Sequence, residues 1–323
     1  MIVPATSPPP EPPTPHAPRE GQTFAGASRF IAYANLVKLP HTVFALPFAL
    51  VGVVLASYRR PLRMSDVAWV IVAFTAARFA AMAFNRISDR EIDRRNPRTA
   101  MREIPRGTVS VTEAWISVVV ASGLFTVAAG QLNRLCLILS PVALAWIMFY
   151  SYTKRFTRWS HLVLGWSLAI APVGGYLAVT GSWSRPAWML VALALGVATW
   201  VAGFDVFYSL QDVEFDRAER LQSLPVSLGE TGSIRVARLL HAISIVALAA
   251  VGLAVSAGMW YWVGTALAAL LLVYEHSLVQ PGNLNKLDAA FFTMNGMISI
   301  AFFFFVLMDR LTRATGFGVR LLQ

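Results

Sequence analysis

Two short polar strings, AFNRISDREID and FDVFYSLQDVEFD, interrupt an otherwise apolar chain and carry the residues best suited to chemistry. Their amide, phenol and carboxylate groups belong to Asn85, Asp89, Asp93, Asp205, Tyr208, Asp212 and Asp216. Carboxylates are costly near lipid and are kept there mainly where function requires them. On a helix, groups that recur every fourth residue lie along one face. Two such faces that converge would form a site for a divalent cation and a charged phosphate compound.

Magnesium is the cation that this set of oxygen donors favours. Mg²⁺ commonly binds through one or two carboxylates together with phosphate oxygens of a substrate. We predict that its ligands are Asn85, Asp89, Asp93, Asp212 and Asp216. Unpaired carboxylates in such a cluster would repel one another, and a bound cation relieves that repulsion.

Surface salt bridges are the alternative interpretation of these acidic residues. The candidate cations in and after the first string are Arg86, Arg90, Arg94 and Arg95. We favour salt bridges for the glutamates that lie off the predicted face, which are Glu91, Glu214 and Glu219. For the four recurring aspartates we favour metal binding.

Basic residues near the strings could hold a diphosphate. Arg98, Arg102 and Arg106 follow the first string in RRNPRTAMREIPRG, and an arginine fork recognises phosphate oxygens with two hydrogen bonds. Lys154, in YSYTKRFT, could stabilise the negative charge of a departing diphosphate. The alternatives are an orientation signal for the arginines and a membrane-interface anchor for Lys154.

Two further charged residues lie deeper in the predicted helices. Arg78 precedes Asn85 by two turns, and an arginine inside a span needs a polar partner. That partner is either a substrate carboxylate or phosphate, or an acid of the strings. Asp205 is either an acid–base group or the partner of Arg78. Aromatic rings beside the strings could stabilise a carbocation, although we favour core packing for Phe84, Phe204, Phe215 and Trp166.

The elements that position these residues are predicted to be membrane-spanning helices. The chain has 323 residues, of which 56% are hydrophobic and only 14% charged, against about 25% charged in typical soluble domains. Apolar runs long enough to cross a bilayer separate its charged segments. We therefore predict an all-α polytopic membrane protein with nine spans, at about 29–57, 65–88, 111–131, 133–151, 161–180, 186–210, 233–256, 258–278 and 287–308.

The two strings close the second and sixth spans, so both face the same side of the membrane. This pattern fits two parallel four-helix halves plus a ninth helix. The basic loops predict a cytoplasmic N-terminus and a cytoplasmic site. The domains are then a Pro-rich arm at 1–27, a membrane domain at 28–310 and a tail at 311–323.

Other functions are less consistent with the pattern. The net charge of +10 lies in loops between apolar spans, so we predict a bilayer environment and no nucleic-acid partner. Cys136 is the single cysteine, so no intramolecular disulfide is predicted. A transporter for an anionic lipid or metal stays open, since intramembrane acids also mark ion pathways. Acids confined to one side argue against it.

The sequence resembles the UbiA superfamily of intramembrane prenyltransferases. NRISDREID and DVFYSLQDVEFD are similar to its two Asp-rich motifs. The resemblance extends, in family order, through KLPHTVFALPFAL, NPRTAMREIPRG, YSYTKRFT, GWSLAIAPVGGYLAVTG and LQSLPVSLG. It covers nearly all of residues 30–308.

This resemblance implies a nine-helix bundle in the inner membrane that transfers a polyprenyl group from its diphosphate to an aromatic acid, using Mg²⁺. It implies that Lys154, Arg98 and Arg102 hold the diphosphate. Tyr208 and Asp205 would lie on the acceptor side, and Arg78 would meet the acceptor carboxylate. Among acceptors it favours 4-hydroxybenzoate. Asn85 is followed by Arg86 and not by Asp, a form that also resembles the branch that prenylates 1,4-dihydroxy-6-naphthoate for menaquinone.

Overall fold

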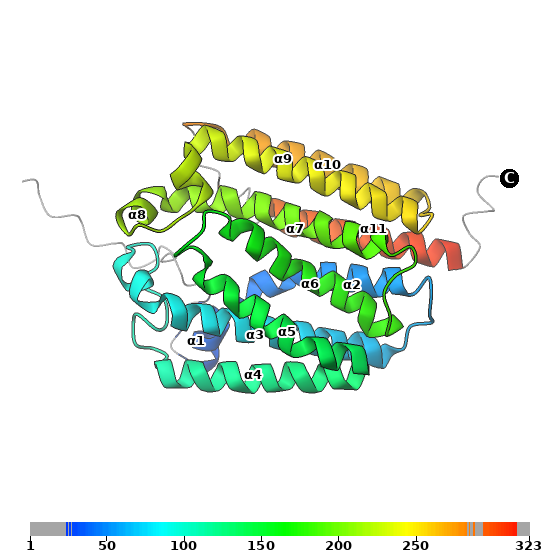
Figure 1. Cartoon of the computed structure of the whole chain (residues 1–323), viewed down its shortest axis with the longest axis horizontal. Helices are drawn as coiled ribbons and strands as arrows, with labels where there is room; N and C mark the ends of the chain where they lie inside the picture. The colour runs from blue at the N-terminus through cyan, green and yellow to red at the C-terminus, as the bar shows by residue number, and fades with distance from the viewer. Residues whose placement is uncertain are drawn as a thin grey trace, which may run out of the picture.

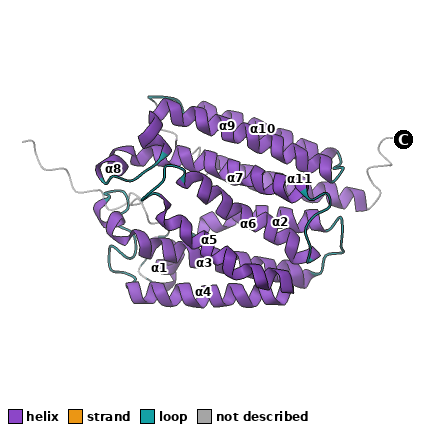
Figure 2. Ribbon diagram, viewed as in Figure 1, coloured by secondary structure: helices purple, strands orange, loops and turns teal. Residues whose placement is uncertain are grey.

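The chain folds into a bundle of long helices (Figures 1 and 2). The structure is a computed structural model, and it describes residues 24, 26, 28–282, 284, 287 and 293–314, apart from the side chains of 39–44 and 314. Nearly all of the predicted N-terminal arm lies outside these residues, as do most of the predicted tail and the first part of the predicted ninth span.

All regular elements of the described chain are helical. They are α1 (Arg29–Leu36), α2 (Leu39–Ala56), α3 (Met64–Arg95), α4 (Val111–Leu132), α5 (Arg134–Thr153), α6 (Ser160–Thr180), α7 (Trp188–Ser209), the short 3₁₀ helix η1 (Leu210–Asp212), α8 (Val213–Ala218), α9 (Leu224–Ala254), α10 (Met259–Leu278) and α11 (Asn295–Ala314). The predicted all-α fold is confirmed.

Seven of the described helical segments are long and apolar enough to span a membrane, and Ala45–Ala56 is a shorter apolar segment. The predicted first span is divided, because Lys38 adopts a left-handed conformation between α1 and α2. The predicted seventh span begins earlier than expected, at Leu224, and Gly229 interrupts it with a φ of 67° that an L side chain rarely adopts. The chain is thus a multi-pass membrane protein, and the count of nine stays a prediction.

Local sequence signals fix the ends of several helices. Ser110 begins α4 with a capping box, in which its side chain accepts from Glu113 N and the Glu113 carboxylate accepts from Ser110 N. Asn133 caps α5 through Cys136 N, and Ser223 caps α9 through Val226 N. Such caps satisfy backbone N–H groups that a helix end leaves unpaired.

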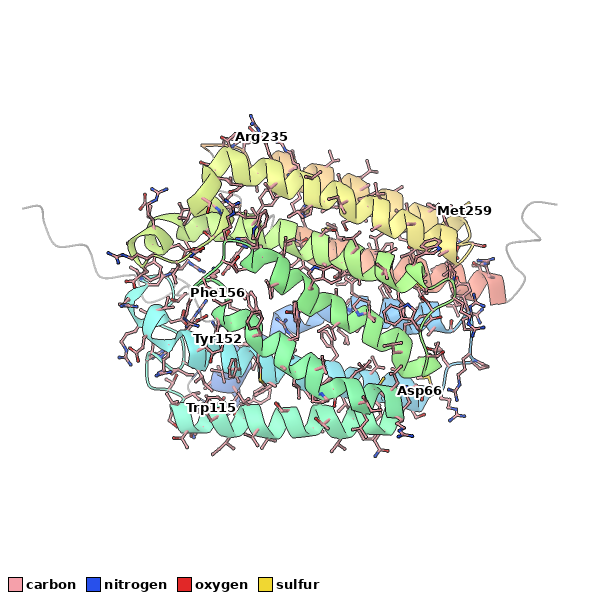
Figure 3. The ribbon with its side chains drawn as sticks, in the orientation of Figure 1. Asp66, Trp115, Tyr152, Phe156, Arg235 and Met259 are labelled. Carbon is pink, nitrogen blue, oxygen red and sulfur yellow. The ribbon has the colours of Figure 1, made fainter. Side chains whose placement is uncertain are left out.

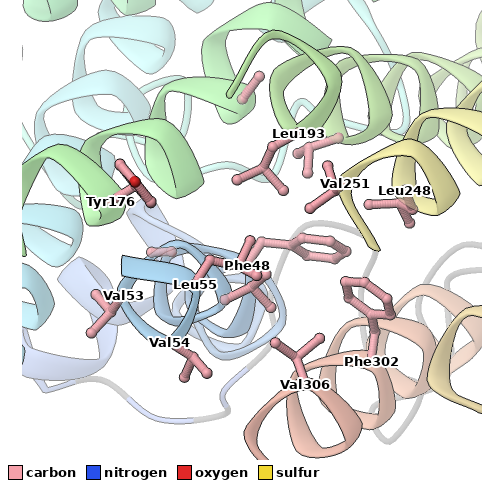
Figure 4. Close-up of a cluster of buried hydrophobic side chains, with 14 of the residues drawn as sticks. Phe48, Val53, Val54, Leu55, Tyr176, Leu193, Leu248, Val251, Phe302 and Val306 are labelled. Carbon is pink, nitrogen blue, oxygen red and sulfur yellow. The ribbon is translucent and has the colours of Figure 1, made fainter. Parts of the chain in front are cut away.

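The helices form a closed ring. Each long helix from α2 to α7 and from α9 to α11 packs on the next in chain order, and α11 returns to pack on α2. An apolar core fills the interior, with Phe48 of α2, Leu193 of α7 and Phe302 of α11 among its buried side chains (Figure 4). Helices α6 and α7 approach very closely, because a Cβ added to Gly165 would lie 2.1 Å from the Ala198 carbonyl oxygen.

This topology brings the two polar strings to one end of the bundle. Asp66, at the start of α3, and Met259, at the start of α10, lie at the opposite end from Tyr152, Phe156 and Arg235 (Figure 3). The first string occupies the last three turns of α3, and the second runs from the end of α7 through η1 into α8. The end of the bundle that carries Tyr152 therefore carries both strings.

Candidate active site

A polar cavity of about 150 Å³ lies between the two strings. Its lining includes all seven string residues predicted to be functional, together with the predicted cations Arg98, Arg102 and Lys154. The structure therefore brings together ten of the eleven predicted site residues. Arg78 is the exception, since it is not among the residues that line this cavity.

The first string lies along one face of α3, as the spacing predicts. Asn85 donates a hydrogen bond of 2.9 Å to Asp89, and Arg155 contacts the other Asp89 oxygen at 3.0 Å. Arg102, from the loop after α3, contacts Asp93 at 2.5 Å. Both aspartates thus have an arginine partner contributed by a loop.

The second string does not lie on one continuous α-helix, so the prediction of a single helical face for its residues was wrong. The 3₁₀ helix η1 places Asp212 at a local change of helical geometry. Arg98 donates from Nε to Asp212 Oδ1 at 2.8 Å and from Nη2 to Oδ2 at 2.5 Å. Its third donor, Nη1, contacts the Tyr208 hydroxyl at 2.9 Å. Arg98 therefore joins two members of the string.

Lys154 differs from the arginines, because no hydrogen bond or ion pair of its ammonium is found in the described part of the chain. Burial alone would lower the pKa of Lys154, but the carboxylates of Asp216, Asp205, Asp212 and Asp89 outweigh burial and raise it above its ordinary value. Lys154 therefore carries a full positive charge that several acids share.

Several buried polar atoms in the cavity lack a hydrogen-bond partner among the described residues. They are Asp93 Oδ2, Asp216 Oδ2 and Arg102 Nε. Two carboxylate oxygens suit a hard cation such as Mg²⁺, and an arginine N–H suits a phosphate oxygen. Within the described chain, no three His, Cys, Asp or Glu side chains already converge closely enough to hold a metal ion. The donor set therefore fits Mg²⁺ when substrate phosphate oxygens complete it.

The predicted salt bridges are present for some of the glutamates. Glu91 contacts Arg94 at 3.2 Å, and Glu219 contacts Arg95 at 2.9 Å. Aromatic packing is also present, because the Phe84 ring makes edge contacts with Trp115 and Tyr152. Phe204 packs in the same way on Trp200.

The sequence interpretation missed two residues that contact the predicted site. Arg155, which follows the predicted site residue Lys154, pairs with Asp89. His161, at the start of α6, contacts Asp205 at 2.7 Å and is fully buried. No local spacing indicates this contact, since the two residues lie on different helices. The sequence signal available was a histidine that closely follows the basic segment KRFTR.

Comparison with known proteins supports the assignment of the fold and identifies the family. The profile of the UbiA prenyltransferase family matches residues 45–305. A 4-hydroxybenzoate octaprenyltransferase from Nitrosospira multiformis is 28% identical over 292 residues, 88% of this chain and 98% of the relative. One from Xanthomonas campestris is 32% identical over 217 residues, 66% of this chain and 70% of the relative.

Solved structures agree with this assignment. A UbiA homologue from Aeropyrum pernix, in its apo form, superposes with a TM-score of 0.77 at 35% identity, over 83% of this chain and 98% of that chain. A UbiA homologue from Archaeoglobus fulgidus bound to GPP and Mg²⁺ has the same fold, with a TM-score of 0.69 at 21% identity, over 87% and 99%. The predicted resemblance is confirmed: this chain belongs to the UbiA prenyltransferase family and is a membrane-embedded prenyltransferase.

Proposed function

We propose that the protein transfers a polyprenyl group from polyprenyl diphosphate to the ring of 4-hydroxybenzoate in the synthesis of a respiratory quinone. The observation that carries this proposal is the cavity in which five aspartates face Arg98, Arg102, Arg155 and Lys154. A diphosphate needs both kinds of group, since cations contact its oxygens directly and carboxylates hold Mg²⁺ against them. The names of the curated relatives support the choice of acceptor.

The chain's own cations are proposed to bind the diphosphate. Arg98, Arg102 and Lys154 would contact its oxygens, and each arginine would exchange an aspartate partner for phosphate. Asn85, Asp89, Asp93, Asp212 and Asp216 would hold Mg²⁺, which when bound neutralises negative charge on the leaving group. As the allylic C–O bond breaks, its electron pair leaves with the diphosphate. The fixed positive charges stabilise that developing charge.

The acceptor is proposed to lie on the side of Tyr208 and Asp205. An electron-rich ring carbon attacks C1 of the prenyl group, which forms the new C–C bond. The ring C–H bond then breaks, its electrons restore aromaticity, and Asp205 accepts the proton. Arg78 lies deeper along α3 and outside the lining of this cavity, so its proposed pairing with the acceptor carboxylate would require the acceptor to extend beyond the cavity toward it.

A second candidate acceptor is 1,4-dihydroxy-6-naphthoate. It is favoured by the first string, in which Arg86 follows Asn85. Arg86 is buried at 2% exposure, and its Nε donates to the Leu36 carbonyl at 3.3 Å. Arg86 therefore connects α3 to the end of α1, one residue after the proposed ligand Asn85.

The experiment is an acceptor competition in membranes that contain the overproduced protein. Radiolabelled polyprenyl diphosphate and Mg²⁺ are supplied with each acid separately, and lipid-soluble products are separated. Label in prenylated 4-hydroxybenzoate supports the first proposal, and label found with the naphthoate alone supports the second. No product with either acid would contradict both.

We also propose that the site faces the cytoplasm in the inner membrane. Labelling of a cysteine introduced near Arg94, compared between intact cells and opened vesicles, would test this orientation.

A further inference from the structure

His161 is a buried histidine that contacts the proposed acceptor side of the cavity. It occupies the first turn of α6 and is 0% exposed, and it is not among the residues that line the cavity. Its Nδ1 lies 2.7 Å from Asp205 Oδ2. It therefore cannot touch a substrate in the cavity directly, but it can act through Asp205.

The second ring nitrogen of His161 determines where the imidazole proton lies. The backbone N–H of Leu224 points at Nε2, at 3.4 Å. A backbone N–H can only donate, so Nε2 must accept and cannot carry a proton. The remaining proton of the neutral ring is then on Nδ1, where it is donated to Asp205. Three helices, α6, α7 and α9, fix this arrangement.

This contact leaves one carboxylate oxygen of Asp205 available. Oδ2 is held by His161, while the side chain of Asp205 is 14% exposed and lines the cavity. Within the described chain, His161 is the side chain that hydrogen-bonds to this carboxylate. The close approach of α6 and α7 at Gly165 and Ala198 keeps the two helices in register. Asp205 is therefore held with Oδ1 toward the cavity.

We propose that His161 is a positioning residue that orients Asp205 to accept the proton of the acceptor ring. The inference rests on the proposed transfer to an aromatic acid. A misdirected carboxylate would slow the loss of the ring proton, whereas binding of the prenyl diphosphate depends on other residues. The effect is expected in kcat and not in KM for the diphosphate.

The test compares His161→Phe with His161→Asn in the purified protein. Asparagine carries an amide N–H at the position of Nδ1 and can still donate to Asp205, whereas phenylalanine cannot. We expect kcat to fall about 10- to 100-fold in His161→Phe and to be largely restored in His161→Asn. With a ring-deuterated acceptor, the isotope effect on kcat should rise in His161→Phe. His241→Phe, at a second buried histidine that packs on α7 but is not among the residues that line the cavity, is the matched control.

The outcomes separate this inference from the proposed function. Absence of any aromatic product with the unmodified protein would overturn both. Normal transfer by the unmodified protein, with His161→Phe no slower than His241→Phe, would overturn the role of His161 alone. If His161→Phe does not fold, His161→Gln replaces it, because its amide lies one bond farther from the backbone. Equal kcat values for the Asn and Gln variants would then overturn the inference.

Discussion

Arg98 and Asp212 form a bidentate ion pair, with donor–acceptor distances of 2.8 and 2.5 Å. The same guanidinium contacts Tyr208, and its carbon lies 5.1 Å from the centre of that ring. Burial alone would lower the pKa of Arg98. The hydrogen bonds and charges of Asp212 and Tyr208 outweigh burial, so the pKa lies above its ordinary value. The loop after α3 is thereby fixed to the second string.

Replacing Arg98 should weaken substrate binding. We expect Arg98→Gln to raise KM for polyprenyl diphosphate about 10- to 100-fold, because a charge-assisted contact is lost and Asp212 loses its ion-pair partner. Steady-state kinetics with Arg94→Gln as the control would check this. Arg94 is exposed and pairs with Glu91 outside the cavity, so its loss should leave KM unchanged. Equal KM values for both variants would refute a direct role for Arg98.

Asp216 offers a test of metal binding, because its Oδ2 is buried without a partner among the described residues. Asp216→Asn should raise the Mg²⁺ concentration for half-maximal activity about 10- to 100-fold, since an amide is a weaker ligand than a carboxylate. Titration of activity with Mg²⁺ measures this. Asp66→Asn, at the far end of α3, should match the unmodified protein. An unchanged Mg²⁺ requirement in Asp216→Asn would argue against a ligand role.

Lys154 should remain charged in alkaline solution, because its pKa is raised above its ordinary value. A raised pKa means that the proton is lost only above the ordinary range, so the positive charge persists from about pH 7 to about pH 9. We therefore expect Lys154→Met to lower kcat by a factor that is constant over this range. Lys154→Arg, which keeps the charge, is the control. A factor that shrinks as the pH rises would show that Lys154 loses its proton.

Gly165 should be intolerant of a side chain, since its Cβ would lie 2.1 Å from the backbone oxygen of Ala198. We expect Gly165→Ala to cost about 1–3 kcal/mol by forcing α6 and α7 apart. Thermal stability followed by size-exclusion chromatography in detergent measures the loss. Gly174, on the same helix, has nothing within 4 Å of its added Cβ. If Gly174→Ala is destabilised as much as Gly165→Ala, the close approach is not the cause.

The sequence predicted those parts of the site that depend on local spacing. Asp89 and Asp93 lie on one face of α3 because the helical period brings every fourth residue together. Long apolar runs likewise predicted the helices. The partner of each charged group could not be predicted from spacing, because Arg155 reaches Asp89 and His161 reaches Asp205 only after separate helices have packed.

Departures of the backbone from regular α-helix also could not be predicted from the local sequence pattern. The 3₁₀ turn at Leu210–Asp212 does not change the hydrophobic pattern, so the spacing of the second string predicted a continuous helix there. Gly229 lies before the predicted seventh span, which begins at residue 233, so neither the start of α9 at Leu224 nor the break at Gly229 was predicted. Arg78 illustrates the same limit. Its position on α3 followed from the sequence, but the direction of a long side chain depends on the helices around it.

The most direct test of the central claim is transfer of label from radiolabelled polyprenyl diphosphate to an aromatic acid by the Asp89→Ala and Asp212→Ala variants. Both carboxylates line the cavity from opposite strings, so the account predicts that each variant folds and inserts normally but loses transfer. Glu214→Ala, beside Asp212 but outside the cavity lining, should remain active. Undiminished transfer by either aspartate variant would contradict the proposed diphosphate site.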